Sequence, residues 1–158
     1  MKKLLLGITI YCFCVLNVCA QDFASSEAEY DSIYAINITK SKLNGVYIPK
    51  DVADAHKRLL KLTPANDIKK FMTAPEVEVC QKLHLGIGRW MIFNWNFYDG
   101  SRMSQHLKDK GLSHPDDMAQ FLLRTLHRHM NKLEPTHDEM INHLVAERKK
   151  EVLSRINR

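Results

Sequence analysis

Residues 85–98 read LGIGRWMIFNWNFY and form the most apolar stretch that follows the first 20 residues. Its aromatic and aliphatic side chains leave almost no polar face. A helix that is apolar all round is buried by its neighbours, so this stretch is expected at the centre of the fold. A ligand groove lined by Trp95, Phe97 and Tyr98 is the alternative interpretation.

Helical signals flank the apolar stretch on both sides. Before it, apolar residues recur at helical spacing from Val52 to Leu62, and Pro64 and Pro75 each suit the first turn of a further helix. After it, residues 99–101 (DGS) predict a turn and a helix cap. Gly111 is expected to end the next helix in the left-handed conformation that glycine accepts without strain.

The remaining sequence continues in helices. A helix is predicted over 115–133, Pro135 interrupts it, and Thr136 begins a last helix that runs to about Ile156. No long alternating pattern typical of β-strands is present in the sequence. The sequence therefore predicts an all-α fold, an irregular bundle of five or six short helices after a cleaved signal peptide.

The chain divides into segments of different character. The predicted organisation is a signal peptide over 1–20, a flexible lead-in over 21–45, a helical domain over 46–133 and a C-terminal amphipathic helix over 134–158. A short helical turn near 27–33 is an alternative within the lead-in.

The first residues predict export. Lys2 and Lys3 precede an apolar run, and small residues before Gln21 suit signal cleavage. The run is shorter than the roughly 20 apolar residues of a membrane-spanning helix. Lipid attachment at Cys19 is the rival interpretation, but Val18 directly before the cysteine fits it poorly. The expected location is the periplasm or the exterior, with no transmembrane segment in the mature chain.

Cleavage would leave Cys80 as the one cysteine, so stability is expected from core packing rather than a disulfide. Cys80 is expected to be a buried small apolar residue, and a nucleophile paired with His84 is the alternative. Cleavage also removes two lysines, so the formal net charge falls from +5 to +3. This modest charge and export together argue against a nucleic-acid partner.

Residues 113–118 read SHPDDM and raise the main functional question. A helix start explains them: His114 or the residue before it as cap, Pro115 in the first turn, and Asp116 and Asp117 beside the positive end of the helix dipole. The alternative is a hydrolase-like enzyme that uses His114 and Asp117 as an acid–base pair. Adjacent aspartates on a helix point about 100° apart and the histidines are scattered, so neither a metal site nor a cofactor is predicted.

Arg102 suggests a recognition surface. A fork of Arg102 onto Asp116 or Asp117 would join two helix starts, or form a patch beside Trp95. The candidate binding residues are therefore Trp95, Arg102, His114, Asp116 and Asp117, and no catalytic residue is assigned.

Several short motifs, in order, resemble a family of small uncharacterised bacterial proteins that is known as a domain of unknown function. The motifs lie between residues 46 and 131 and are Tyr47-Ile48-Pro49-x-Asp51 with Ala55 and Leu59, Leu85-Gly86, Asn94-Trp95, Gly100-Ser101-Arg102, Gly111 and His114-Pro115-Asp116-Asp117-Met118. The family pattern has an arginine and an asparagine where this chain has Ile92 and Phe93, which removes any polar role there. The resemblance implies an all-helical domain in the bacterial envelope and supplies no reaction.

These features favour a non-enzymatic binding or interaction module over the hydrolase-like alternative. The partner is expected to be a protein or a small molecule, and the sequence does not define the ligand, the oligomeric state or the biological process. The C-terminal helix offers a further alternative, because Arg148, Lys149, Lys150 and Arg155 lie beside an apolar edge that would suit an anionic membrane surface. Packing of that edge on the bundle is the favoured interpretation.

Overall fold

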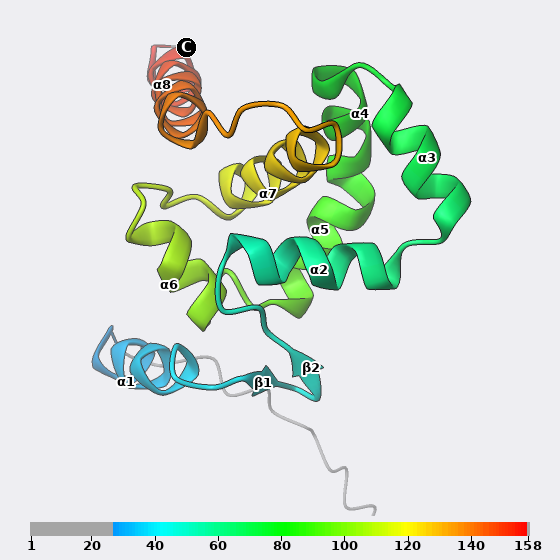
Figure 1. Cartoon of the computed structure of the whole chain (residues 1–158). Helices are drawn as coiled ribbons and strands as arrows, with labels where there is room; N and C mark the ends of the chain where they lie inside the picture. Colours follow the sequence, from blue (N-terminus) through cyan, green and yellow to red (C-terminus); the bar gives the residue numbers. More distant parts are fainter. Residues whose placement is uncertain (1–26, 158) are drawn as a thin grey trace, which may run out of the picture.

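The computed structural model describes residues 27–157, so the signal peptide predicted over 1–20 and the alternative lipid site at Cys19 lie outside the described residues. Within these residues the chain is mainly helical, with one small two-stranded sheet (Figure 1), which confirms the all-α prediction. The elements in order are α1 (Glu27–Asn37), β1 (Lys42–Leu43), β2 (Val46–Tyr47), α2 (Val52–Leu62), α3 (Ala65–Thr73), α4 (Glu76–Leu83), the π-helix η1 (His84–Gly88), α5 (Arg89–Asn94), α6 (Arg102–Lys108), α7 (Pro115–Met130) and α8 (His137–Ile156).

Helix α7 is the centre of the bundle. It packs against α2, α3, α4, η1, α5, α6 and α8, and Figure 1 shows it enclosed by these helices. Its apolar side chains Met118, Phe121 and Leu122 are fully buried because an apolar stripe at helical spacing meets neighbours on several sides.

The apolar stretch 85–98 packs onto α7, but it does not form one buried helix. A π-turn begins it, α5 ends at Asn94, and Asn96 then adopts a positive φ of 53°. Successive side chains therefore face different directions: Trp95 and Phe97 are buried, whereas Phe93 is 62% exposed and Tyr98 53% exposed. The expectation of an entirely buried stretch is wrong for these two aromatic residues.

The starts of α6 and α7 follow the caps that the sequence predicts, whereas Thr136 precedes α8 without a capping hydrogen bond from its side chain. Ser101 caps α6 through a reciprocal capping box with Ser104. His114 caps α7 by accepting a hydrogen bond from the backbone N–H of Asp116, with Pro115 at the first helical position. Gly111 has a φ of 102°, which confirms its left-handed conformation.

The segment before β2 differs from the flexible lead-in expected over 21–45, because its described part contains α1 and β1. Three side chains tie α1 to the turn before α6 and to α6 itself: Tyr30 donates to the Tyr98 carbonyl, Asn37 to the Asp99 carbonyl, and Tyr34 to Gln105. These long-range bonds have no local sequence signature.

Helix α8 buries apolar side chains against the bundle in its first turns, where Met140 and Ile141 are buried, and further along it contacts α7 through Arg148 and Asp117. Beyond them Val145, Val152 and Ile156 are 44–74% exposed. The apolar edge expected to pack on the bundle is therefore mostly uncovered. Across residues 27–157, no helix combines the length and the apolar character required to cross a membrane.

Candidate functional site

The predicted binding residues do not form one surface. Trp95 has no exposed area, and its ring lies against those of Trp90 and Phe97, with centroids 5.8 and 6.3 Å away. A side chain without exposed surface cannot contact a partner, so Trp95 belongs to the core.

Arg102 binds backbone rather than a carboxylate. Its Nε and Nη2 atoms both donate to the Ile48 carbonyl, and its guanidinium lies over the Tyr47 ring at 5.1 Å. The bidentate pairing with Asp116 or Asp117 that the sequence suggested is therefore not formed. Arg102 instead fastens the link between β2 and α2 onto α6.

The SHPDDM residues separate into a cap and two tertiary ties. Asp116 Oδ1 accepts a hydrogen bond of 2.9 Å from His84 Nε2. Asp117, which is buried, accepts hydrogen bonds of 3.2 and 2.7 Å from Arg148 Nε and Nη2. Both Asp117 oxygens are thus occupied by Arg148 while His114 caps α7, so the expected acid–base pair of His114 and Asp117 is not assembled.

The His84 ring is held by Asp116. Its Nε2 contacts Asp116, and its Nδ1 is buried without a hydrogen-bond partner beside Gly88, where a Cβ atom would lie 3.0 Å away. Cys80 has no exposed area, and burial raises its pKa to about 12. A thiol in that state is unreactive, so the alternative of a nucleophile paired with His84 is wrong.

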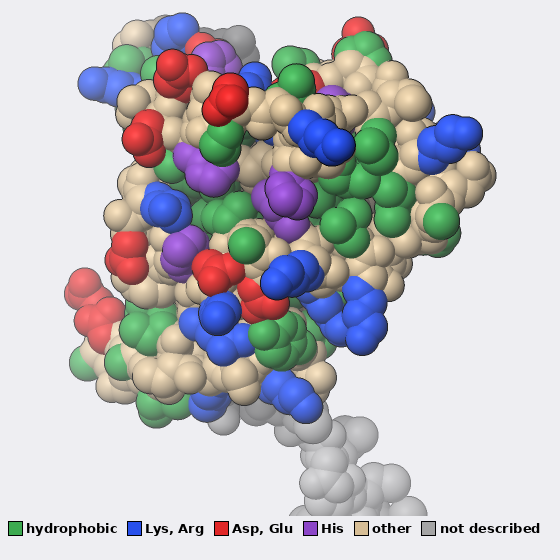
Figure 2. Space-filling model, viewed as in Figure 1, with side chains coloured by type: hydrophobic (Ala, Val, Ile, Leu, Met, Phe, Trp, Pro, Cys, Tyr) green, Lys and Arg blue, Asp and Glu red, His purple; other side chains and the backbone are tan. Residues whose placement is uncertain are grey.

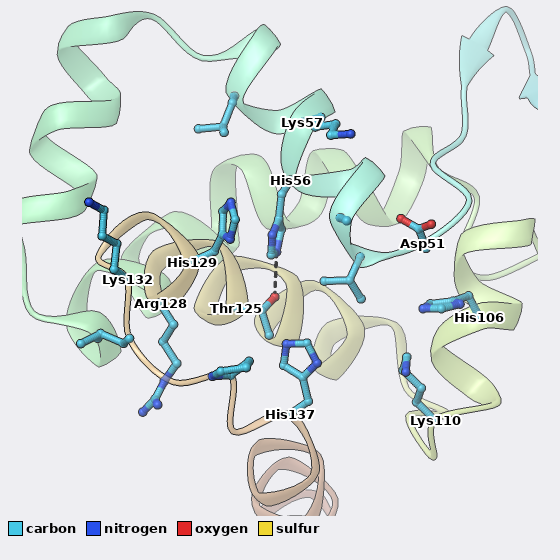
Figure 3. Close-up of a pocket in the computed structure, with 15 residues that line it drawn as sticks. Asp51, His56, Lys57, His106, Lys110, Thr125, Arg128, His129, Lys132 and His137 are labelled. Atoms are coloured by element: carbon cyan, nitrogen blue, oxygen red, sulfur yellow. Dashed lines mark hydrogen bonds between the residues drawn. The ribbon is translucent and has the colours of Figure 1, made fainter.

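A cavity of about 590 Å³ lies elsewhere, between α2, α6, α7 and the segment that leads into α8 (Figure 3). Figure 2 shows histidine side chains gathered on this face with apolar side chains between them. The polar lining consists of nitrogen-bearing side chains from each of these segments, namely His56, Lys57, His106, Lys110, Arg128, His129, Lys132 and His137. Among the described residues that line the cavity, Asp51 is the only carboxylate, and it also caps α2 by accepting from the Asp54 N–H at 2.8 Å.

Two residues fix the floor of this cavity, which we call the histidine pocket. His56 Nε2 lies 3.0 Å from the Thr125 hydroxyl oxygen, and that hydroxyl donates its proton to the Phe121 carbonyl at 2.8 Å. Since the hydroxyl proton is already committed, Thr125 accepts from His56, whose proton therefore sits on Nε2. His129 lies one turn after Thr125, and its ring centroid is 5.4 Å from that of His56.

The pocket combines neutral imidazoles with charged lysines. Burial, reinforced by His129 and His137, lowers the pKa of His56 to about 4. Burial and then the charge of Lys110 lower the pKa of both His106 and His137. The His56 ring is consequently an uncharged N–H donor at neutral pH, the lowered pKa of His106 and His137 favours their neutral form, and the lysines supply the positive charge.

Arg128 contributes less charge than the lysines, because its Nε lies 2.9 Å from Glu76 Oε2. Over the described residues, no cluster of three or more His, Cys, Asp or Glu side chains is arranged to hold a metal ion. The sequence interpretation did not find this pocket, since its histidines stand singly on separate elements. The local signal is the spacing Thr125–His129, which places two side chains on one face of α7.

The comparisons with known proteins identify a family but no individual relative. A family model described as Domain of unknown function (DUF6794) matches residues 48–130, more than half of the chain. The chain belongs to this family. The DUF6794 region contains His56, His106 and His129 and ends before His137 and α8. No curated protein and no solved structure matches the chain.

Proposed function

We propose that the chain is an exported, non-enzymatic binding module and that the histidine pocket binds a small organic anion. The observation that carries the proposal is the lining of the pocket: lysines and imidazoles from several elements converge there, against a single carboxylate that is already engaged as a helix cap. Positive charge gathered along the walls of a cleft raises the local concentration of anions above that near an isolated surface lysine.

The size and the apolar part of the lining favour an organic ligand over an inorganic ion. A volume of about 590 Å³ falls within the range of ordinary small-molecule sites. Leu60, Leu133 and Pro135 line the pocket beside the basic groups, so they can cover the carbon skeleton of a ligand while the polar groups fix its orientation.

A binding role is supported over hydrolysis by the state of the polar floor. Thr125 donates its hydroxyl proton to a backbone carbonyl, and His56 commits its Nε2 proton to Thr125. A nucleophile requires a base that can take its proton, and this pair is arranged in the opposite direction.

Calorimetric titration of the mature chain with small carboxylates and phosphates tests the proposal. We expect an anionic ligand to bind, its uncharged amide or alcohol analogue to bind much more weakly, and Lys110→Ala to weaken anion binding about tenfold. Lys61→Ala is the matched control, because it removes a lysine from the exposed face of α2 outside the pocket. Equal binding of charged and uncharged analogues, or full affinity in Lys110→Ala, would contradict the proposal.

Export is tested separately by the mass of the protein recovered from the cell envelope or the medium. We expect a processed chain that begins at Gln21, because the residues before it suit signal cleavage. A chain that retains Met1 and stays with the cytoplasmic fraction would refute export, and a lipid-modified Cys19 would establish the rival processing route.

A further inference from the structure

The charged groups of the histidine pocket are divided between two ends. Figure 3 shows Lys132 and His129 on one side, Lys110 and His106 on the other, and His56 with Thr125 between them. All of these side chains line the same cavity. Lys110 and Lys132 are therefore separated across the floor, and the third lysine of the lining, Lys57, lies on α2 apart from both ends.

The electrostatic contacts run along the pocket in the same order. The charge of Lys110 acts on both His106 and His137, so these three groups form one end. The charged forms of His137 and His129 both lower the pKa of His56. His56 on the floor therefore lies between the Lys110 end and the side where His129 and Lys132 lie. Asp51 and Asp109 act on His106, and Asp138 acts on His137, so negative charge is already present at the Lys110 end.

Lys132 is held at its end by a strained backbone. It follows α7 with a φ of 55°, and the Leu133 N–H closes back onto the Arg128 carbonyl at 3.0 Å. This is a helix ending at which glycine is the usual residue, because a Cβ atom is unfavourable in the left-handed conformation. A lysine there lowers stability and places a cation at the rim of the pocket.

We propose that the ligand of the histidine pocket is an organic diacid whose two acidic groups, carboxylate or phosphate, are separated by a short carbon chain. One acidic group is held by Lys110 with His106 and His137, and the other by Lys132. This inference rests on the proposed function and adds the chemical class of the ligand. A ligand with one acidic group could engage only one of the two ends, because a lysine ammonium binds one acidic group as a point charge.

Calorimetry with a graded series of probes tests this inference on the mature chain. The series contains α,ω-dicarboxylates from succinate to suberate, the monocarboxylate of each length, and propane-1,3-diyl bisphosphate. We expect one dicarboxylate length to bind at least about tenfold more tightly than its monocarboxylate. Comparison of that dicarboxylate with the bisphosphate shows which acidic group the pocket prefers.

Two variants assign the ends. Lys110→Ala and Lys132→Gly are each expected to reduce dicarboxylate binding to the level of the monocarboxylate, whereas Lys61→Ala leaves it unchanged. Lys132→Gly is also expected to raise the melting temperature, because glycine removes the strain at this helix ending. Weaker binding in a more stable protein cannot result from misfolding.

The outcomes separate the two proposals. If monocarboxylates bind as tightly as every dicarboxylate, the inference of a ligand with two acidic groups is refuted and the proposed function stands. If neither class nor the bisphosphate binds, both are refuted. If dicarboxylates bind more tightly but Lys132→Gly keeps their full affinity, the assignment of the second end is overturned.

Discussion

The burial of His56 makes the stability of the molecule depend on pH. The folded protein holds His56 neutral, with a pKa of about 4, against 6.5 for an unperturbed histidine. As the pH falls below 6.5, the unfolded chain takes up a proton that folded His56 still refuses. The contribution of His56 to stability is therefore complete above about pH 6.5 and is lost progressively down to about pH 4.

Replacement of His56 by glutamine is expected to remove this dependence. The glutamine amide can donate to Thr125 as His56 does and does not titrate. Between pH 7.5 and pH 5 we expect the wild-type free energy of unfolding to fall by about 2 kcal/mol more than that of His56→Gln. Urea unfolding at the two pH values measures this difference. The control is His143→Gln, at an exposed position of α8, which is expected to behave as the wild type; an equal fall in both variants would refute the role of His56.

At this scale the sequence predicted roles that depend on near neighbours and missed those that depend on distant ones. The caps at Ser101 and His114 and the burial of Cys80 are confirmed, because each follows from residues within one helical turn or from an apolar local setting. The partner of Arg102 is a carbonyl 54 residues away, which no local pattern specifies.

Helix α8 lies beyond the DUF6794 match and is joined to it by a partly buried ion pair. Arg148 contacts both oxygens of Asp117 at the start of α7, and the Asp117 side chain is only 11% exposed. Charge-assisted bonds to a carboxylate so shielded contribute more than exposed pairs such as that of Arg155 with Glu151.

Arg148→Lys is expected to loosen α8 without unfolding the bundle. Lysine cannot reproduce the two parallel bonds of the guanidinium, so we expect a loss of about 1–3 kcal/mol in the stability of α8. Hydrogen exchange of peptides from residues 137–156 measures the change, with peptides from α5 as the internal reference. Arg155→Lys provides the comparison, since its ion pair is exposed; equal exchange in the two variants would show that the Asp117 contact does not hold α8.

Among the elements, amphipathic helices were predictable, and short irregular ones were not. The apolar stripe of α2 recurs at helical spacing in the sequence, and the starts of α6 and α7 are marked by capping residues. The π-helix η1 has no such period. The β1–β2 hairpin turns at Asn44-Gly45, with φ values of 48° and 77° that fit an Asn-Gly hairpin turn. Its two-residue strands are too short to show an alternating pattern.

The whole molecule is needed to form the histidine pocket, because α2, α6, α7 and the start of α8 each contribute one histidine to its described lining. These positions share no motif, and their convergence depends on the packing of α7 at the centre. For that reason the candidate site, unlike the helices, was beyond reach of the sequence alone.

Anion binding in this pocket is expected to take up protons. The free protein holds the pKa of His106 and His137 low, through burial and Lys110, and a bound anion would offset both causes. Since the complex then binds protons more readily than the free protein, affinity rises as the pH falls. We expect several-fold tighter dicarboxylate binding at about pH 6 than at about pH 8, with a smaller difference in His137→Gln. Calorimetry in two buffers of different ionisation enthalpy measures the proton uptake; its absence would contradict this coupling.

The position of His137 outside the family region makes the pocket modular. The DUF6794 region supplies the floor and most of the rim, and the segment after it supplies the remaining wall. Family members that carry a different sequence after this point would keep the same pocket floor and have a different wall beside it. Ligand preference in this family is thus expected to follow the downstream segment, and exchange of that segment between two members would transfer the preference with it.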